Sequence, residues 1–435
     1  MSESPSSPEN PSSAWLSLVA VLVVQAQNAF NDNFVKLVLI GVAGVVAAGT
    51  ATGNYIEHIL TAMIPLPFIL LAPLAGWFSD RYPKNRVTYA ALVAKALIFG
   101  LLIFALWIRS VPLALFADFL LAVQSTIFSP AKQGILKELV GSKKLGTANG
   151  LMQMLAMAGI LGGMTVAGTW FDAELGQRNT ERGILPGNAW DAAIYVTIVA
   201  GLASILPLVL GLFIRRTPEH PEIRFRAAVM WSHFLDLNYL FGHAVLRRTG
   251  LFIAFYWFVA NFVGLTFFSF AKELHPNLAE GGASSSSARM LAVIGVGLIA
   301  GSLFVSFLTR KGNQLLLSVS GGLLMALGMA GLSFLRPEAL PWFGAIVMVG
   351  FASGFFVVPL SAHLQDQIAE DYRGRVLSAQ NLLISFSGIV AIGTSFLMKA
   401  AGLSASIQTL VFVPLLIFVS LMLHRMLKSS ALKAA

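Results

Sequence analysis

The sequence predicts an all-α membrane protein of about twelve transmembrane helices, arranged as two six-helix bundles. Hydrophobic residues make up 57% of the 435 residues and charged residues only 11%, and the mean hydropathy is +0.77. A typical soluble domain contains about 25% charged residues. Apolar runs of roughly 20 residues, enough to cross a bilayer, recur along the whole chain. The longest polar break, 215–248, follows the sixth run.

Alternation of apolar runs and polar breaks gives the expected elements in chain order. An even number of helices puts both termini on the same side of the membrane. The segment 1–13 is rich in Ser and Pro and has no Lys or Arg, so it is predicted to be a disordered tail and not a signal peptide. The helices are expected near 15–44, 55–78, 86–108, 112–138, 146–170, 189–214, 249–273, 288–309, 313–335, 340–368, 374–400 and 404–427.

The positive charges predict the orientation of these helices. If the termini are cytoplasmic, 19 of the 29 Lys and Arg residues fall on the cytoplasmic side, 7 on the opposite side and 3 inside helices. Cytoplasmic loops of membrane proteins are enriched in Lys and Arg. The net charge of +9 therefore needs no nucleic-acid partner, and none is expected.

The polar break divides the chain into two related halves. We expect similar elements in both, because Pro130 and Pro359 lie 229 residues apart and Asn149 and Asn381 lie 232 residues apart. Transporters built from such repeats rock one half against the other around a central site. In the linker, 223–241 is either an interfacial helix or a solvated connection. The divisions are a cytoplasmic tail 1–13, a bundle 14–214, a cytoplasmic linker 215–248, a bundle 249–427 and a cytoplasmic tail 428–435.

A charged turn follows the second predicted helix, with the sequence GWFSDRYPKNR at 76–86. It resembles the loop signature of the major facilitator superfamily, G-x-x-x-D-R-x-G-R-[RK], although Pro83 stands where the second glycine is usual. The resemblance implies a loop that gates the conformational change, with a glycine that lets helices approach closely. A positively charged loop without a gating role is the alternative. The expected gate residues are Gly76, Asp80, Arg81, Lys84 and Arg86.

The first helix carries a polar stripe. Gln25, Asn28, Asp32 and Lys36 are spaced i, i+3, i+7 and i+11, and so share one face. Asp32 lies roughly 26 Å along the helix from Trp15, deep in the bilayer, where an unpaired charge costs at least about 2.5 kcal/mol. Either this stripe lines a substrate pathway, or Asp32 and Lys36 form a structural pair that holds helices together.

Two further lysines, Lys95 and Lys132, fall inside the third and fourth helices, and Asp118 shares a face with Lys132. Three lysines against two acids suit an anionic group such as phosphate, which lysine binds as a point charge. Mutual neutralisation without a ligand is the alternative. In the second half the polar residues are nearly uncharged, which predicts an asymmetric site with a softer second wall. The expected substrate-binding residues are Asn28, Asp32, Lys36, Lys95, Lys132, Asn149, Gln365 and Asn381.

Several segments resemble the bacterial lysophospholipid transporter family. They are FNDNF at 30–34, SPAKQGILKEL at 129–139, ANGLM at 148–152, GFFVVPLSAHLQ at 354–365 and QN at 380–381. The resemblance implies an inner-membrane flippase that moves lysophospholipids from the outer to the inner leaflet, and we expect a monomer. It also implies a cytoplasmic acyltransferase/acyl-ACP synthetase that adds the second chain. The seventh helix departs from the family pattern, because 257–268 contains no arginine.

Two other functions stay open. A proton-coupled exporter of amphipathic drugs or metabolites would use Asp32 as its proton carrier. A membrane anchor for an acyltransferase would use 215–248. Nucleotide-binding, serine-hydrolase and zinc-protease motifs are absent from the sequence, and it has no cysteine. We therefore expect no enzymatic activity and no cofactor.

Overall fold

The protein is all-helical in the computed structural model, which describes residues 11–222, 225, 229–309, 313–368 and 373–434. Within these residues, 12 helical spans are long and apolar enough to cross a membrane. The predicted fold class and helix number are therefore confirmed. Residues 1–10 of the predicted tail and part of the segment 223–241 lie outside the described residues, as do the side chains of 428–435, whereas residues 11–13 of that tail already belong to a helix.

The helices fall into two halves with a short connecting helix. The first half contains α1 (Pro11–Val46), α2 (Ala51–Asn54), α3 (Ile56–Met63), α4 (Pro65–Arg81), α5 (Lys84–Trp107), α6 (Val111–Arg182), α7 (Pro186–Ala203) and α8 (Ile205–Gly211). The connection contains α9 (Val229–Gly242). The second half contains α10 (Ala244–Leu274), the 3-10 helix η1 (Leu278–Glu280), α11 (Ala283–Leu308), α12 (Gln314–Phe334), α13 (Leu340–Asp366), α14 (Arg373–Ala400) and α15 (Ala405–Ala434).

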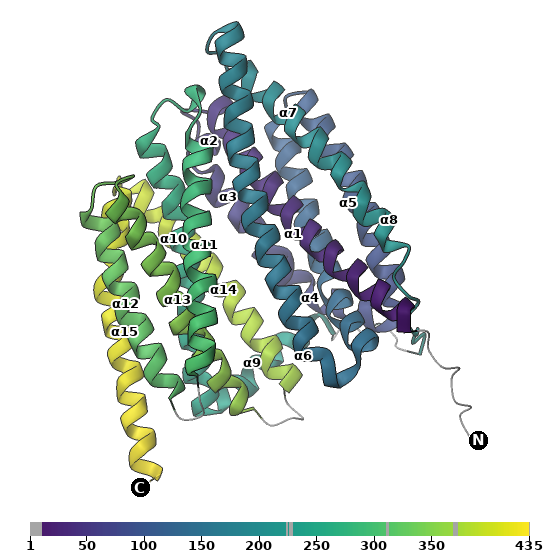
Figure 1. Cartoon of the computed structure of the whole chain (residues 1–435), viewed down its shortest axis with the longest axis vertical. Coiled ribbons are helices and arrows are strands. Elements are labelled where there is room, and N and C mark those ends of the chain that lie inside the picture. The colour runs from purple at the N-terminus through teal and green to yellow at the C-terminus, as the bar shows by residue number, and fades with distance from the viewer. Residues whose placement is uncertain (1–10, 223–224, 226–228, 310–312, 369–372, 435) are drawn as a thin grey trace.

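Figure 1 shows the two halves side by side, with α1 to α8 in purple to teal and α10 to α15 in green to yellow. The first residues of α1 and the last residues of α15 lie at the same end of the molecule, as an even number of spans requires. We call this the terminal end. The opposite end, formed by residues 47–55, 183–185 and 275–282, is called the distal end.

Several helix boundaries differ from the expectation. The expected break between the fourth and fifth helices, at 139–145, is helical, so α6 contains both spans, and the expected helix 189–214 is divided into α7 and α8. The fifth helix was expected to end at 170, but α6 continues to Arg182 and projects beyond its neighbours in Figure 1. The polar residues there pair along the helix, as Arg178 with Glu174 and Gln177 with Glu181. The second predicted helix is interrupted at Ile64 because Pro65 has no N–H to donate, so α3 and α4 are separate elements.

Close helix contacts depend on small residues at two positions of α6. A Cβ added to Gly163 would lie 2.3 Å from the backbone oxygen of Phe30, so α1 and α6 touch through their backbones. A Cβ added to Gly168 would lie 2.5 Å from the backbone oxygen of Ser284 in α11. Such contacts are typical of membrane helices, where van der Waals packing replaces the hydrophobic drive. α6 therefore joins α1 within the first half and α11 in the second.

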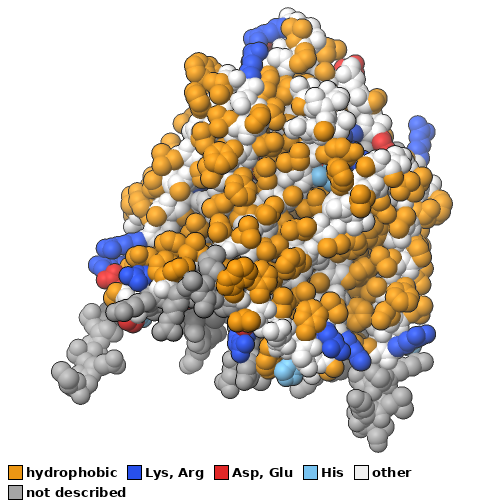
Figure 2. Space-filling model, turned by 180° about the vertical axis from the view of Figure 1, so that it is seen from behind, with side chains coloured by type: hydrophobic (Ala, Val, Ile, Leu, Met, Phe, Trp, Pro, Cys, Tyr) orange, Lys and Arg blue, Asp and Glu red, His pale blue; other side chains and the backbone are white. Residues whose placement is uncertain are grey.

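The surface agrees with a membrane location. Figure 2 shows hydrophobic side chains over most of one face, with Lys and Arg gathered at the two ends. Large apolar side chains such as Leu97 and Phe307 are strongly exposed. A soluble protein rarely exposes an apolar surface that covers most of one face. These side chains therefore face lipid, and the charged ends mark the two membrane surfaces.

Candidate functional site

A cavity of about 220 Å³ lies within the first half, against the polar stripe of α1. Its walls come from α1, from the break between α3 and α4, and from both spans of α6. The expected second wall, from the other half of the chain, is therefore not part of this cavity. The lining residues are Gln25, Asn28, Ala29, Asp32, Asn33, Lys36, Ile64, Phe68, Asp118, Leu121, Ala122, Ser125, Phe128, Lys132 and Ile160.

Asp32 lies at the centre of the stripe and is held by two neighbouring helices. Its Oδ1 accepts a 2.6 Å hydrogen bond from Nζ of Lys95 on α5, and its Oδ2 accepts a 2.7 Å bond from Oγ of Ser125 on α6. Lys95 also donates to the side-chain and backbone oxygens of Asn28, at 2.8 and 3.2 Å. Its three donors are thereby used, and it is only 2% exposed. Lys95 positions Asp32 and does not line the cavity.

Lys132 faces the cavity nearer the terminal end. Its Nζ donates one 2.9 Å hydrogen bond to the side-chain oxygen of Gln25 and lies 5.5 Å from the ring centre of Phe128. A lysine has three donors, and among the described residues this is the one hydrogen bond that Lys132 makes. Donors therefore remain for a ligand.

Lys36 and Asp118 line the cavity nearer the distal end, and both are buried, at 9% and 7% exposed. Within the described part of the chain, neither makes a hydrogen bond or an ion pair. The Asp32–Lys36 pair considered from the sequence is thus not formed, because Asp32 pairs with Lys95 instead. The amide nitrogen of Asn28 is also buried without a partner among the described residues. Groups of both signs, and an unused donor, therefore lie at the same cavity.

The remaining predicted site residues lie elsewhere. Gln365, at the end of α13, and Asn381, on α14, are exposed and do not line the cavity. The side chain of Asn149 lies outside the described residues. The cavity thus unites Asn28, Asp32, Lys36 and Lys132, with Lys95 directly behind them.

In the charged turn between α4 and α5, the ion pair that Lys84 makes lies within the first half, while α4 itself packs against α9 and α14. Nζ of Lys84 donates a 2.5 Å hydrogen bond to Glu138 of α6, within the first half. The guanidinium of Arg81 stacks over the Trp77 and Tyr82 rings at 5.6 and 5.7 Å. Asp80 and Arg86 are exposed. A Cβ on Gly76 would meet no atom within 4 Å, so the expected close helix approach at this glycine is wrong for this conformation.

Comparison with known proteins decides the family. The family model of the Major Facilitator Superfamily matches residues 14–392. The chain belongs to this superfamily. It is a multi-pass membrane transporter.

The resemblance noted from the sequence motifs is also confirmed. The chain is 27% identical over 401 residues to a protein named lysophospholipid transporter LplT from Enterobacter sp. (strain 638), covering 89% of each chain. It is 28% identical over 375 residues to the protein of the same name from Serratia proteamaculans (strain 568), covering 84% of each.

Solved structures show the same fold. The nucleoside transporter NupG superposes with a TM-score of 0.65 at 11% identity, covering 95% of this chain and 99% of that one. A bacterial homologue of the human lysosomal transporter Spinster, in an inward-facing and unoccupied conformation, gives a TM-score of 0.64 at 15% identity, covering 97% and 99%.

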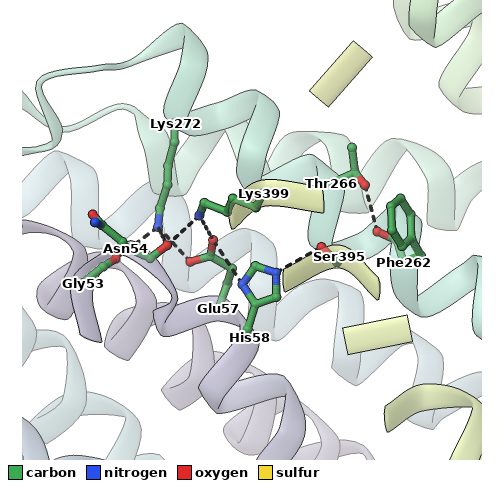
Figure 3. Close-up of polar contacts among 9 residues, drawn as sticks. All are labelled: Gly53, Asn54, Glu57, His58, Phe262, Thr266, Lys272, Ser395 and Lys399. Atoms are coloured by element: carbon green, nitrogen blue, oxygen red, sulfur yellow. Dashed lines mark hydrogen bonds and ion pairs between the residues drawn. The ribbon is translucent and has the colours of Figure 1, made fainter. Parts of the chain in front are cut away.

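A second polar cluster of this transporter joins the two halves at the distal end (Figure 3). The Glu57 carboxylate of α3 is fully buried and binds Nζ of Lys272 from α10 at 2.7 Å and Nζ of Lys399 from α14 at 2.5 Å. Beside it, Nε2 of His58 lies 3.0 Å from Oγ of Ser395 on α14. We call Glu57, Lys272 and Lys399 the distal ion cluster.

Sequence reasoning missed the distal ion cluster and counted both lysines only as loop charges. A signal was present. Glu57 begins the second span, Lys272 ends the seventh and Lys399 ends the eleventh, so all three lie at the same depth of the membrane. Opposite charges at one depth on different helices are candidates for an ion pair.

Proposed function

We propose that this protein transports lysophospholipids from the outer to the inner leaflet of a bacterial inner membrane, with both termini in the cytoplasm. The names of its relatives and the excess of Lys and Arg at the terminal end support this. A cytoplasmic acyltransferase/acyl-ACP synthetase would then consume the product. The protein would act as a monomer surrounded by membrane lipids.

The observation that carries the proposal is the chemistry of the cavity. The Lys36 ammonium and the Asp118 carboxylate face the same buried space, and neither has a hydrogen-bond or ion-pair partner among the described residues. The two groups attract each other only from beyond ion-pair distance, and buried charges without a close partner are costly. A zwitterionic headgroup, with an anionic phosphate and a cationic amine, would pair with both at once. Lysophosphatidylethanolamine carries such a headgroup.

The size of the cavity supports binding of the headgroup alone. Pockets that enclose whole drug-sized ligands are roughly 300–1,000 Å³, whereas this cavity has about 220 Å³. The polar headgroup fits a space of this size, but an added acyl chain does not. In this proposal the chain stays in the apolar environment of the membrane while the headgroup crosses through the protein.

The stripe on α1 offers two positions for the phosphate. Lys36 and Asp118 form the distal position, and Lys132 with Gln25 forms the terminal one. Lys36 and Gln25 are eleven residues apart, so the two positions lie roughly 16 Å apart along the helix. The headgroup would pass from the first to the second, with the buried amide of Asn28 between them. The Asp32 carboxylate, held by Lys95 and Ser125, would repel the phosphate and so prevent tight binding in the middle of the path.

The experiment uses purified protein in liposomes with labelled lysophosphatidylethanolamine added to the outer leaflet. Inward movement is measured as the label that albumin can no longer extract. We expect protein-dependent movement that Lys132→Gln and Lys36→Gln reduce at least about tenfold, since each removes a charge-assisted hydrogen bond. Arg336→Gln, which removes an exposed charge outside the cavity, is the control and should transport normally.

The same liposomes test the export alternative. A proton-coupled exporter would respond to an imposed pH gradient and lose that response in Asp32→Asn. Protein-dependent movement that ignores the gradient supports the flippase, whereas equal movement in liposomes with and without protein would refute it.

A further inference from the structure

A second cavity lies beside the distal ion cluster, between the two halves. Its volume is about 450 Å³. One wall is the turn between α1 and α3, and the other consists of the turn after α10 and the end of α14. Lys272 and Lys399 line it, together with uncharged residues such as Asn54, Tyr55 and Asn277. Among the described residues, the lining contains two cations and no carboxylate.

The two lysines share a single carboxylate. Besides binding Glu57, Nζ of Lys399 donates to the backbone oxygen of Asn54 at 2.6 Å, and Nζ of Lys272 donates to that of Gly53 at 3.2 Å. Glu57 is completely buried behind them, whereas the lysine side chains are 20% and 21% exposed. The cluster therefore presents a net positive charge to the cavity and keeps its one negative charge inside.

We propose that Lys272 and Lys399 form a binding site for an anionic phosphate group that arrives at the distal end, and that the phosphate competes with Glu57 for them. This inference rests on the proposed transport function, in which the distal end faces outward. Lysine binds phosphate as a point charge, and two lysines at one cavity wall can hold one phosphate together. The phosphate of a lysophospholipid and free inorganic phosphate share this chemistry.

This competition would couple phosphate binding to separation of the two halves at the distal end. Glu57 belongs to the first half and both lysines belong to the second, so their ion pairs hold the halves together. A phosphate bound by the lysines takes their charge from Glu57 and weakens that connection. A ligand shifts a conformational equilibrium only by its difference in affinity between the states. Here the difference in affinity arises because the lysines bind Glu57 in the closed state and the phosphate in the open state.

The absence of cysteine allows a local test. An environment-sensitive fluorophore is attached to the cysteine of an Asn277→Cys variant, at the exposed rim of the cavity, and its fluorescence is measured with the protein in nanodiscs. The probes are lysophosphatidylethanolamine, inorganic phosphate, and a monoacylglycerol with the same chain and no phosphate. We expect saturable responses to lysophosphatidylethanolamine and none to monoacylglycerol. A response to inorganic phosphate alone would overturn the lipid source of the phosphate, and a response to monoacylglycerol would overturn phosphate recognition.

Charge variants separate a binding site from a merely structural ion cluster. Lys272→Gln combined with Lys399→Gln should weaken binding at the reporter by at least about tenfold, and Glu57→Gln should strengthen it because the competing anion is gone. Lys272→Arg with Lys399→Arg should restore binding, which shows that the fold is intact. Arg336→Gln is the charge-matched control at the same end. If the cluster is only structural, Glu57→Gln and the Lys272→Gln/Lys399→Gln variant should instead change binding in the same direction.

The distance between the halves provides a second readout. Spin labels at Ile184→Cys and Leu340→Cys, both exposed at the distal end, should report longer distances in Glu57→Gln without ligand and in the otherwise unaltered protein with lysophosphatidylethanolamine. If the Lys272→Gln/Lys399→Gln variant binds lysophosphatidylethanolamine as tightly as the unaltered protein, the phosphate site at the distal end is refuted. Continued transport in liposomes would then show that the proposed function itself still holds. Absence of transport by the unaltered protein would instead refute the proposed function.

Discussion

Replacing Lys95 should destabilise the protein far more than replacing Lys132, although both are lysines inside membrane helices. In Lys95→Met, the Oδ1 of Asp32 and the side-chain oxygen of Asn28 lose their donor. Removing one partner of a buried ion pair costs about 3–5 kcal/mol. Asp32 keeps its bond to Ser125, and its side chain is 29% exposed. We therefore expect the lower limit, a loss of about 3 kcal/mol in the free energy of unfolding.

Lys132→Met removes much less. Among the described residues, Lys132 makes one hydrogen bond, to the neutral amide of Gln25, and a contact with the Phe128 ring. A hydrogen bond from a charged donor contributes about 1.5 kcal/mol at the lower limit, and methionine retains the apolar part of the ring contact. The two variants should thus differ by about 1.5 kcal/mol in stability. Transport should nevertheless be lost in Lys132→Met, because this lysine faces the proposed phosphate.

Unfolding of purified protein by sodium dodecyl sulfate in mixed micelles measures this difference. A further variant, Lys95→Met with Asp32→Asn, serves as the control, since it removes the unpaired charge and should recover part of the stability. Equal destabilisation by Lys95→Met and Lys132→Met would refute the assignment of a positioning role to one and a substrate contact to the other. So would a stable Lys132→Met protein that transports at the normal rate.

Three further predictions concern packing and the charged turn. Gly76→Ala should leave stability within about 0.5 kcal/mol and transport unchanged, because its added methyl group meets open space. Gly163→Ala should destabilise the protein by about 1–3 kcal/mol, because the added methyl group overpacks against the Phe30 backbone. The same unfolding assay measures both glycine variants. A Gly163→Ala protein of unchanged stability would contradict the close contact of α1 and α6. Lys84→Met should cost about 1 kcal/mol or less, as expected for a partly exposed ion pair, and a large loss of stability would show that this pair does more than join α4–α5 to α6.

The number, order and class of the helices could be predicted from the sequence because hydrophobicity and length determine which segments cross a membrane. The end of the fifth helix could not be predicted this way. The polar residues from Asp172 to Arg182 resemble a loop in composition, but they continue α6. Arg178 and Gln177 pair with Glu174 and Glu181 along the helix, and Asp172 and Arg182 bind Ser285 and Asp191 of neighbouring helices. Hydropathy reports where a helix leaves the lipid and not where the helix ends.

The polar stripe of α1 was also predictable, since helical periodicity places its members on one face. Its pairing was not. Asp32 selects Lys95, which is 63 residues away in the sequence, and leaves Lys36 without an ion pair among the described residues. That choice depends on how α1, α5 and α6 approach one another. The distal ion cluster was missed for the same reason, because its three members come from three helices of different halves.

The measurement that tests the central claim most directly is cross-linking of lysophosphatidylethanolamine to the protein in membranes. One probe carries a photoactivatable group at the headgroup amine and a second carries it at the end of the acyl chain. We predict that the headgroup probe modifies residues of α1 and α6 around Lys36, Asp118 and Lys132, and that the chain probe does not. Headgroup cross-links confined to the second half, or identical patterns for the two probes, would contradict a headgroup cavity within the first half.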